Sequence, residues 1–298
     1  MQSESPKIYW ALLTPALLLL GAVFLYPLAR ALRLSWFSQN LTTALVPQFA
    51  GGHNWGRLAG DSRFWQSLSH TLTFTGISVG LELVLGLGIA LLLNQTFWGR
   101  GAVRTIALLP WALPTAIMSL AWAWIFNDQY GVANELLRRW GLMPQGINWL
   151  GDRHWALVAI VIADVWKTTP FITLILLAGL QTIPRELYEA HALEGATPWQ
   201  SLRQITLPLL RPQIAIALLF RFAQAFGIFD LVQVMTGGGP AGATETIAVY
   251  IYGMVMRYLD FGYGATLVVA TFSLLVLGLG IGSQLWRWAF SLASRMGS

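Results

Sequence analysis

Five ionisable side chains stand inside otherwise apolar stretches of this sequence, and they are Glu82, Asp164, Lys167, Arg221 and Asp230. In a membrane, a charge at the centre of a helix costs roughly 2.5–3.5 kcal/mol, so it needs an oppositely charged partner or access to water. Charged groups in such places bind solutes or hold helices together. These five residues are therefore the first place to look for function.

The spacing of these charges limits how they can pair. Asp164 and Lys167 are three positions apart, so on a helix they share one face and could form a local pair. Glu82 and Arg221 each fall towards the middle of an apolar stretch, and we expect them to form an ion pair between two helices. Asp230 follows Arg221 by nine positions, about half a turn out of phase, so these two cannot meet on their own helix.

Catalytic and metal-binding chemistry finds little support elsewhere in the sequence. The chain has no Cys, and its four His residues are dispersed without the spacing of a metal site. No Ser-His-Asp arrangement can be argued from position. The glycine run 237–239 is not followed by the Lys-Ser or Lys-Thr pair of a phosphate-binding loop. We therefore expect no enzyme activity, no metal site and no cofactor held by this chain.

The composition places the charges in a membrane protein. Of the 298 residues, 56% are hydrophobic and only 10% are charged, whereas a soluble domain carries about 25% charged residues. The net charge of +5 is scattered rather than clustered, so it does not indicate a nucleic-acid partner. A helix rises 1.5 Å per residue, so about 20 apolar residues cross a hydrocarbon core roughly 30 Å thick.

Six apolar runs are long enough to cross, at residues 8–29, 72–93, 103–126, 155–180, 214–235 and 265–286. They are continuous, unlike the alternating strands of a membrane barrel, so we predict an all-α polytopic protein with a single transmembrane domain over residues 1–298. The first run could be mistaken for a signal peptide, but its length of about 22 residues favours a retained helix. Basic residues divide evenly between the two sets of loops and do not fix the orientation.

The loop at 183–212 has the local signals of two short helices at an angle. Pro184 suits a first helical turn, and Gly195 can adopt the left-handed conformation that ends a helix. Thr197 is expected to be the N-cap of the second helix, with Gln200 completing a capping box, and Pro208 to end it. These signals predict a rigid helix–glycine–helix turn, although a merely well-capped surface connection would look the same.

The same segment resembles a known family pattern, the EAA loop of permease subunits in ABC importers. That pattern is Glu-Ala-Ala, three residues, Gly, nine residues, Ile, any residue and Leu-Pro. Glu189 and Ala190 open it here, His191 replaces the second Ala, Gly195 takes the Gly position, and residues 205–208 close it. Residues 109–124, 131–134 and 235–240, with Tyr250 and Tyr252, resemble the carbohydrate-uptake branch, the maltose and glycerol-phosphate permeases. The glycines of 235–240 could equally form a plain turn.

This resemblance implies a cytoplasmic coupling loop that docks into a separate ATP-hydrolysing subunit. The residues implied in coupling are Glu189, Ala190, His191, Glu194 and Gly195. With six spans, both termini then lie in the cytoplasm, in an inner or plasma membrane of bacterial type. The implied partners are a second permease subunit, two ATP-binding subunits that carry ATP and Mg²⁺, and an extracytoplasmic solute-binding protein.

The resemblance also implies a path for a sugar or polyol through the later spans. Carboxylates, amides and ammonium groups bind sugar hydroxyls, and aromatic rings pack on apolar sugar faces. Residues of these types are expected to line the path at Asp164, Trp166, Lys167, Gln224, Phe229 and Asp230. A purely structural role for the aromatic residues stays open, because Trp and Phe also anchor membrane helices.

A second class of function is an ion-coupled secondary transporter, whose membrane charges would relay protons or bind sodium. The sequence gives no sign of an inverted repeat or of paired broken helices, which such transporters use. A membrane enzyme is disfavoured by the lack of clustered catalytic residue types. The importer subunit is the preferred interpretation.

Overall fold

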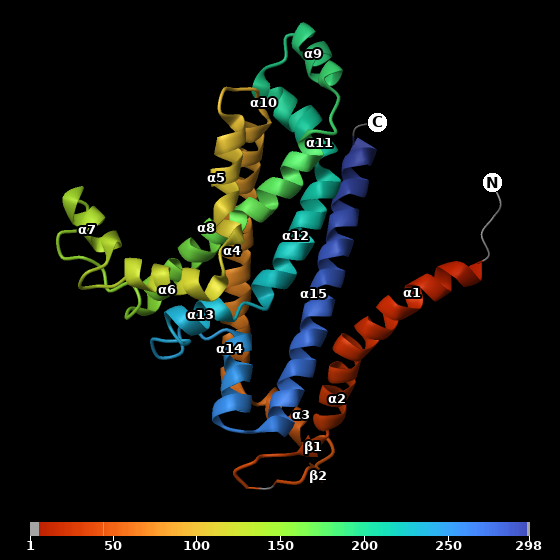
Figure 1. Cartoon of the computed structure of the whole chain (residues 1–298), viewed down its shortest axis with the longest axis vertical. Helices are drawn as coiled ribbons and strands as arrows, with labels where there is room; N and C mark the ends of the chain where they lie inside the picture. The colour runs from red at the N-terminus through yellow and green to blue at the C-terminus, as the bar shows by residue number, and fades with distance from the viewer. Residues whose placement is uncertain (1–5, 44, 297–298) are drawn as a thin grey trace. The chain divides into compact units, whose positions relative to one another are not determined.

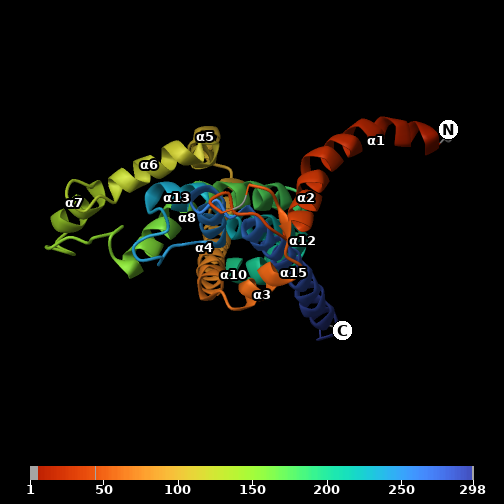
Figure 2. The same cartoon turned by 90° about the horizontal axis from the view of Figure 1, so that it is seen from below.

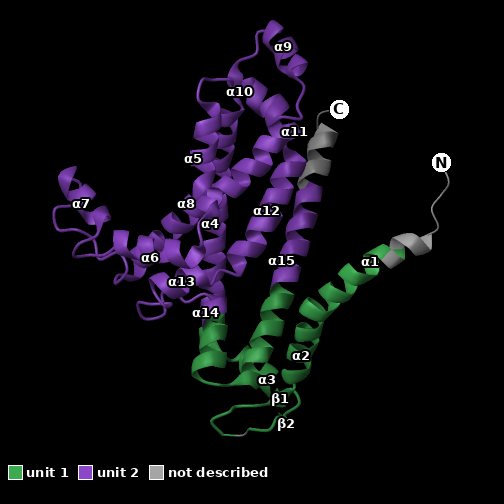
Figure 3. Cartoon of the chain, viewed as in Figure 1, with its two compact units in different colours: residues 1–65, 250–274 green, residues 66–249, 275–298 purple. Residues whose placement is uncertain are grey.

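The computed structural model describes residues 6–43 and 45–296, which are mostly helical as expected (Figure 1). Within these residues the only sheet is one antiparallel pair, β1 (Phe37–Ser38) and β2 (Gln48–Phe49). The chain forms two compact units (Figure 3), residues 1–65 with 250–274, and residues 66–249 with 275–298. The single transmembrane domain over residues 1–298 stays a prediction.

The helices are given in chain order. The chain begins with α1 (Pro6–Leu20), a π-helical segment η1 (Gly21–Leu25), α2 (Tyr26–Leu34), α3 (His53–Ala59) and α4 (Ser62–Asn94). It continues with α5 (Arg100–Ala112), α6 (Thr115–Ile125), α7 (Val132–Arg139), α8 (Arg153–Leu180), α9 (Arg185–Leu193) and α10 (Pro198–Ser201). It ends with η2 (Leu202–Thr206), α11 (Leu207–Leu209), α12 (Arg211–Phe226), α13 (Asp230–Met235), α14 (Ile247–Tyr252), η3 (Gly253–Arg257) and α15 (Phe261–Met296).

Four continuous helical stretches in the described part of the chain are long and apolar enough to cross a membrane. They are Leu12–Leu34, Ser62–Asn94, Arg153–Leu180 and Phe261–Trp288, and they correspond to the predicted first, second, fourth and sixth runs. Two bent pairs could complete six spans, α5 with α6 at 95° and Pro198–Leu209 with α12 at 67°. By length and composition, the described residues thus contain four candidate membrane spans, or up to six if each bent pair is one span.

The third predicted span, 103–126, is wrong as a straight helix. The chain turns by 95° between α5 and α6 (Figure 1). Leu113 and Pro114 have extended backbone torsions there, with ψ of 139° and 129°. The proline ring clashes with a helical conformation of the residue before it and removes a backbone donor. Pro114 thus breaks the helix inside an apolar run.

The fifth predicted span, 214–235, is also wrong, because it joins two separate helices. Helix α12 ends at Phe226 with Gly227 as its C-cap, and α13 begins only at Asp230. Glycine ends helices readily, and an acidic residue in a first turn favours a new start. Before α12, the helical segment that starts at Pro198 does not end at Pro208 as expected but continues to Leu209. The 67° bend into α12 lies at Leu210. The chain thus contains bent and broken helices that the sequence analysis did not indicate.

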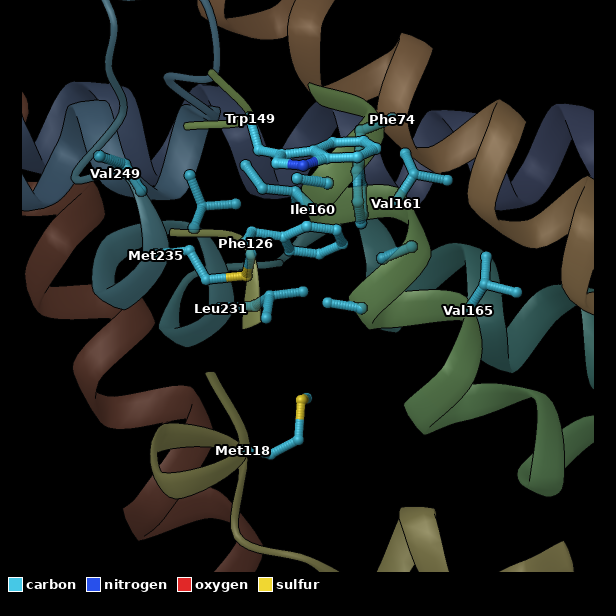
Figure 4. Packing of buried hydrophobic residues seen from close by; sticks show 14 of the residues in the cluster. Phe74, Met118, Phe126, Trp149, Ile160, Val161, Val165, Leu231, Met235 and Val249 are labelled. Atoms are coloured by element: carbon cyan, nitrogen blue, oxygen red, sulfur yellow. The ribbon is translucent and has the colours of Figure 1, made fainter. Parts of the chain in front are cut away.

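The unit formed by residues 66–249 and 275–298 has an apolar core that fixes α8 and α13. Its buried side chains come from α4, α6, α8, α12, α13, α14 and the loop before α8, and α13 packs against α6 and α8 (Figures 1, 2 and 4). The ring centroids of Phe126 and Trp149 are 5.0 Å apart. The labelled members are Phe74, Met118, Phe126, Trp149, Ile160, Val161, Val165, Leu231, Met235 and Val249. This packing anchors the helices on which the candidate site stands.

The other unit is held by a polar cluster around Asp61, just before α4. Asp61 accepts hydrogen bonds from the Tyr250 hydroxyl, at 2.5 Å, and from the Tyr263 hydroxyl. It also accepts from the backbone amides of Arg63 and Phe64. Burial raises the pKa of Asp61, but these four hydrogen bonds outweigh burial and leave its pKa below the usual value. Asp61 therefore caps α4 and ties it to α14 and α15.

Candidate functional site

A buried ion-pair cluster joins three helices. Arg221 of α12 donates from Nε to Glu82 Oε2 of α4 at 2.5 Å and from Nη2 to Glu82 Oε1 at 2.7 Å. The same Nη2 lies 3.1 Å from Asp164 Oδ2 of α8. The exposed fractions are 0% for Glu82, 2% for Arg221 and 6% for Asp164. The expected pair between Glu82 and Arg221 is present, and a second carboxylate shares the arginine.

Uncharged groups satisfy the rest of this cluster. Ser78 Oγ donates to Asp164 Oδ2 at 2.6 Å, and Thr168 Oγ1 lies 2.7 Å from Glu82 Oε1. Arg221 Nη1 donates to Gln224 Oε1 at 3.1 Å. The planar guanidinium thus holds three acceptors at fixed angles, which a lysine could not do. Arg221 sets the orientation of Asp164 and Gln224 together.

A cavity of about 320 Å³ lies beside this cluster, within the same unit. It collects five of the six residues expected along the substrate path, which are Asp164, Lys167, Gln224, Phe229 and Asp230. The remaining lining residues are Trp111, Thr115, Thr168, Gly227, Ile228 and Leu231. A volume of this size is at the lower end of small-molecule pockets.

Both helix breaks that the sequence analysis missed border this cavity. Trp111 and Thr115 flank the bend between α5 and α6, and Gly227, Ile228 and Phe229 form the break between α12 and α13. At membrane depth, non-helical backbone is tolerated only where it is buried in protein or lines a cavity. Lys167 Nζ donates to the Leu113 carbonyl at 2.6 Å and so satisfies an acceptor that the bend frees. The breaks and the polar cavity therefore belong together.

The structure differs from the expected substrate path in two details, the partners of Asp164 and Lys167 and the position of Trp166. Asp164 binds Arg221 and Ser78, while Lys167 binds the Leu113 carbonyl, so their spacing on one helix face is not what determines their partners. Trp166 is not among the lining residues; it is 43% exposed and meets Trp122 edge to face, with ring centroids 5.6 Å apart. Trp111 and Thr115 were missed, because their place in the site depends on the bend beside them.

The loop at 183–212 folds as its local signals indicate. Helix α9 is followed by Gly195 with a φ of +80°, a left-handed conformation that side chains with a Cβ rarely adopt. Thr197 caps α10, and a capping box forms with Gln200. Pro184 is the residue before α9 rather than part of its first turn. A defined helix–glycine–helix turn results.

Both ring nitrogens of His191 have partners within the loop. Its Nδ1 lies 3.0 Å from Ser201 Oγ, and its Nε2 lies 2.9 Å from Gln204 Oε1. Tyr188 Oη and Thr206 Oγ1 form a second link at 2.9 Å. These two contacts join α9 to the α10–η2 segment, so the departure from Ala at position 191 stiffens the turn from within.

The outer surface of α9 is open and partly apolar. Glu189, Ala190, Glu194 and Gly195 are all exposed. Leu193 is 90% exposed and was missed in the sequence analysis. An apolar side chain on a short polar helix was the signal that could have found it. Exposed apolar residues beside charges are typical of a protein docking surface.

The comparison with known families now decides the identity of the fold. Residues 82–285 match the family described as binding-protein-dependent transport system inner membrane component. The chain belongs to this family. The permease is 44% identical over 263 residues to the sulfoquinovosyl glycerol transport system permease protein SmoG of Agrobacterium fabrum, covering 88% of this chain and 85% of that protein. It is 41% identical to the trehalose/maltose transport system permease protein MalF of Thermococcus litoralis, covering 93% and 92%.

A solved structure supports the same fold for the permease. A chain in the crystal structure of a bacterial ABC transporter involved in the import of alginate superposes with a TM-score of 0.80. The two chains are 22% identical, and the match covers 94% of this chain and 95% of that one. The permease is thus an inner-membrane transport component and not an enzyme, with ATP hydrolysis on separate subunits. This membership, rather than helix continuity, decides against an ion-coupled secondary transporter.

Proposed function

We propose that the permease forms the membrane path for a sugar or related polyol, together with a second permease subunit. The observation that carries this proposal is the cavity of about 320 Å³ that unites Asp164, Lys167, Gln224, Phe229 and Asp230. The names of its relatives support the substrate class, since these proteins are transport permeases for sulfoquinovosyl glycerol, trehalose and maltose. Polar groups for hydroxyls and the rings of Phe229 and Trp111 for apolar sugar faces suit such a solute.

The charged groups around this cavity are mostly engaged with one another or with the backbone. Glu82, Asp164 and Asp230 bring three negative charges against the two positive charges of Arg221 and Lys167. Arg221 and Lys167 are both already engaged, with the acids and with the Leu113 carbonyl. Asp230 and Gln224 are exposed and are the acceptors that reach an entering hydroxyl.

The loop at 183–212 would couple this path to ATP hydrolysis from the cytoplasmic side. The exposed residues Glu189, Ala190, Glu194 and Leu193 are the proposed contacts with one of two ATP-binding subunits, which carry ATP and Mg²⁺. We propose six spans, with α5 and α6 together forming the third and α12 the fifth, so that a cytoplasmic loop at 183–212 would leave both termini in the cytoplasm. Residues 1–5 and 297–298 at those termini lie outside the described residues.

A stiff turn transmits movement that a loose one would absorb. The glycine turn and the two polar links between α9 and α10–η2 make the loop suited to pass closure of the ATP-binding subunits to α8 and α12. An extracytoplasmic solute-binding protein would deliver the sugar to the outward-open state, and hydrolysis would reset the inward state. To move such an equilibrium from 1:99 to 99:1 takes about 5.5 kcal/mol of differential binding.

Site-specific crosslinking tests the coupling role. A photoreactive residue at Glu189 or Ala192 on α9 is expected to capture the ATP-binding subunit when all subunits are coexpressed. The same residue at Glu135 on α7 is the control and should not capture it. Capture from Glu135 but not from α9, or transport that persists without nucleotide on an ion gradient, would overturn the proposal.

A further inference from the structure

A second, larger cavity lies where α4 and α5 approach the loop at 183–212. Its volume is about 1050 Å³, and all of its lining residues belong to one unit. Three arginines line it, Arg100 and Arg104 from α5 and Arg185 from α9, and the described lining includes no acidic side chain. The remaining polar lining comes from amides and hydroxyls such as Asn94, Gln181 and Ser201. The cavity is therefore strongly cationic.

Two of these arginines crowd a single acceptor. Arg100 Nε donates to the Leu93 carbonyl at 2.7 Å, and Arg104 Nη2 donates to the same carbonyl at 3.2 Å. The two nitrogen atoms consequently lie within about 6 Å of each other. Arg104 Nε is buried and has no hydrogen-bond partner within the described residues. Capping the last carbonyls of α4 accounts for one arginine, but it leaves a like-charged neighbour and an unused donor.

The helix end supplies too little negative charge to balance this pair. The C-terminus of a helix acts as roughly half an elementary negative charge, whereas the two guanidinium groups carry two positive charges. Arg185 adds a third charge from the opposite wall, and it has no side-chain partner in the described part of the chain. The arrangement needs an anion, and phosphate fits an arginine fork well.

The surroundings of the cavity favour a lipid as the source of this phosphate. The cavity lies at the ends of α4 and α8, two helices that cross the membrane, so it stands at headgroup depth. The two helices that supply Arg100, Arg104 and Asn94 also carry exposed apolar side chains outside the lining, Leu92 of α4 at 60% and Val103 and Ile106 of α5 at 40% and 70%. Trp199, 69% exposed, is one of the lining residues, and tryptophan is enriched at membrane interfaces. Apolar helix surfaces next to a cationic cavity suit a lipid, which has acyl chains as well as a phosphate, better than a free phosphate.

We propose that this cavity binds the phosphate of an anionic phospholipid from the leaflet on the side of the coupling loop. Basic pockets between membrane helices bind anionic headgroups in this way. The headgroup would bridge α5 and α9, so the lipid would brace the coupling loop against the membrane. Assigning the leaflet as cytoplasmic rests on the proposed function, whereas the binding itself does not.

Native mass spectrometry of the assembly purified with phosphatidylglycerol tests the proposal. The wild-type permease is expected to retain the lipid, and the double variant Arg100→Gln/Arg104→Gln to bind it about 30-fold more weakly. Arg203→Gln is the matched control, because Arg203 is exposed on the same loop but does not line the cavity. Arg100→Lys/Arg104→Lys keeps the charges and should retain most of the binding, which separates loss of charge from loss of fold.

Several outcomes would overturn the lipid site. Equal retention in the wild type and in the double glutamine variant would do so, as would a loss in Arg203→Gln of the same size. Displacement of the lipid by inorganic phosphate at equal concentration would assign the cavity to a free anion. Loss of the lipid once the ATP-binding subunits assemble would assign it to their acidic side chains. If no ATP-binding subunit copurifies, the proposed function fails, but lipid retention is still measured on the permease.

Discussion

Two polar regions of the permease are built on opposite plans. The cluster of Glu82, Asp164 and Arg221 is buried and joins residues up to 139 positions apart. The turn around Gly195, the proposed coupling turn, is exposed and makes its side-chain contacts between residues 188 and 206. Desolvation makes each buried charge depend on its partners, whereas exposed contacts contribute little to stability. Substitutions in the buried cluster should therefore reduce the stability of the fold, whereas substitutions in the turn should reduce the coupling of ATP hydrolysis to transport.

The largest effect is expected at Arg221. Arg221→Gln leaves two buried carboxylates without their cation and should destabilise the protein by about 3–5 kcal/mol. Thermal unfolding in detergent, with the amount of protein in the membrane, measures this loss. Glu82→Gln should cost much less in the Arg221→Gln background than in the wild type, because the pair is then already broken. Additive effects of the two changes would show that the buried cluster has no energetic coupling.

A smaller effect, on transport rather than stability, is expected in the cavity. Asp230→Asn removes a charged acceptor that is exposed to an entering solute and should raise the KM for sugar uptake about tenfold. Gln224→Ala should act in the same direction. Trp166→Phe is the control, since Trp166 does not line the cavity and its uptake kinetics should stay unchanged. A changed maximal rate at constant KM would move the role of Asp230 away from binding.

The coupling turn should separate stability from function. Gly195→Ala places a Cβ at a φ of +80°, where no other atom lies within 4 Å, so backbone strain of roughly 1–2 kcal/mol is the only penalty. We expect a modest loss of stability and a larger loss of sugar-stimulated ATP hydrolysis. Gly195→Asn tolerates this conformation better and should retain more activity. Gly101→Ala, within α5 with ordinary torsions and free space, should lower neither property and should slightly raise stability.

The smallest effect is expected to be the pH dependence of stability that Asp61 contributes. Asp61 is only partly buried, so it lies between the fully buried cluster and the exposed turn in its exposure to solvent. Its pKa is lower in the folded than in the unfolded protein, so its contribution is present above an unfolded pKa of about 3.9. The contribution is lost as the pH falls through the lower folded pKa. The difference in unfolding temperature between the wild type and Asp61→Asn should therefore shrink below about pH 4. A difference that grows on acidification would contradict this assignment.

Local signals in the sequence predicted much of the local structure. The capping residues Thr197 and Gln200 and the left-handed Gly195 appear as expected, because each acts over three or four neighbouring residues. The same approach missed the bend at Pro114 and the break at Gly227, where long apolar runs favour one continuous helix. In those runs the continuous hydrophobic pattern hid the effect of one proline or glycine, which nevertheless breaks the helix in the structure.

By itself, the sequence determined the membrane class, the helical fold and the turn at 183–212. Hydrophobic runs set how the chain partitions into lipid, and proline, glycine and capping residues set the backbone within a few positions. Only the tertiary structure decided that Arg221 forms an ion pair with Asp164 as well as with Glu82, and that Lys167 donates a hydrogen bond to the Leu113 carbonyl. Those partners lie 54 to 139 positions apart, and their meeting depends on how helices bend and pack rather than on any periodicity along the chain.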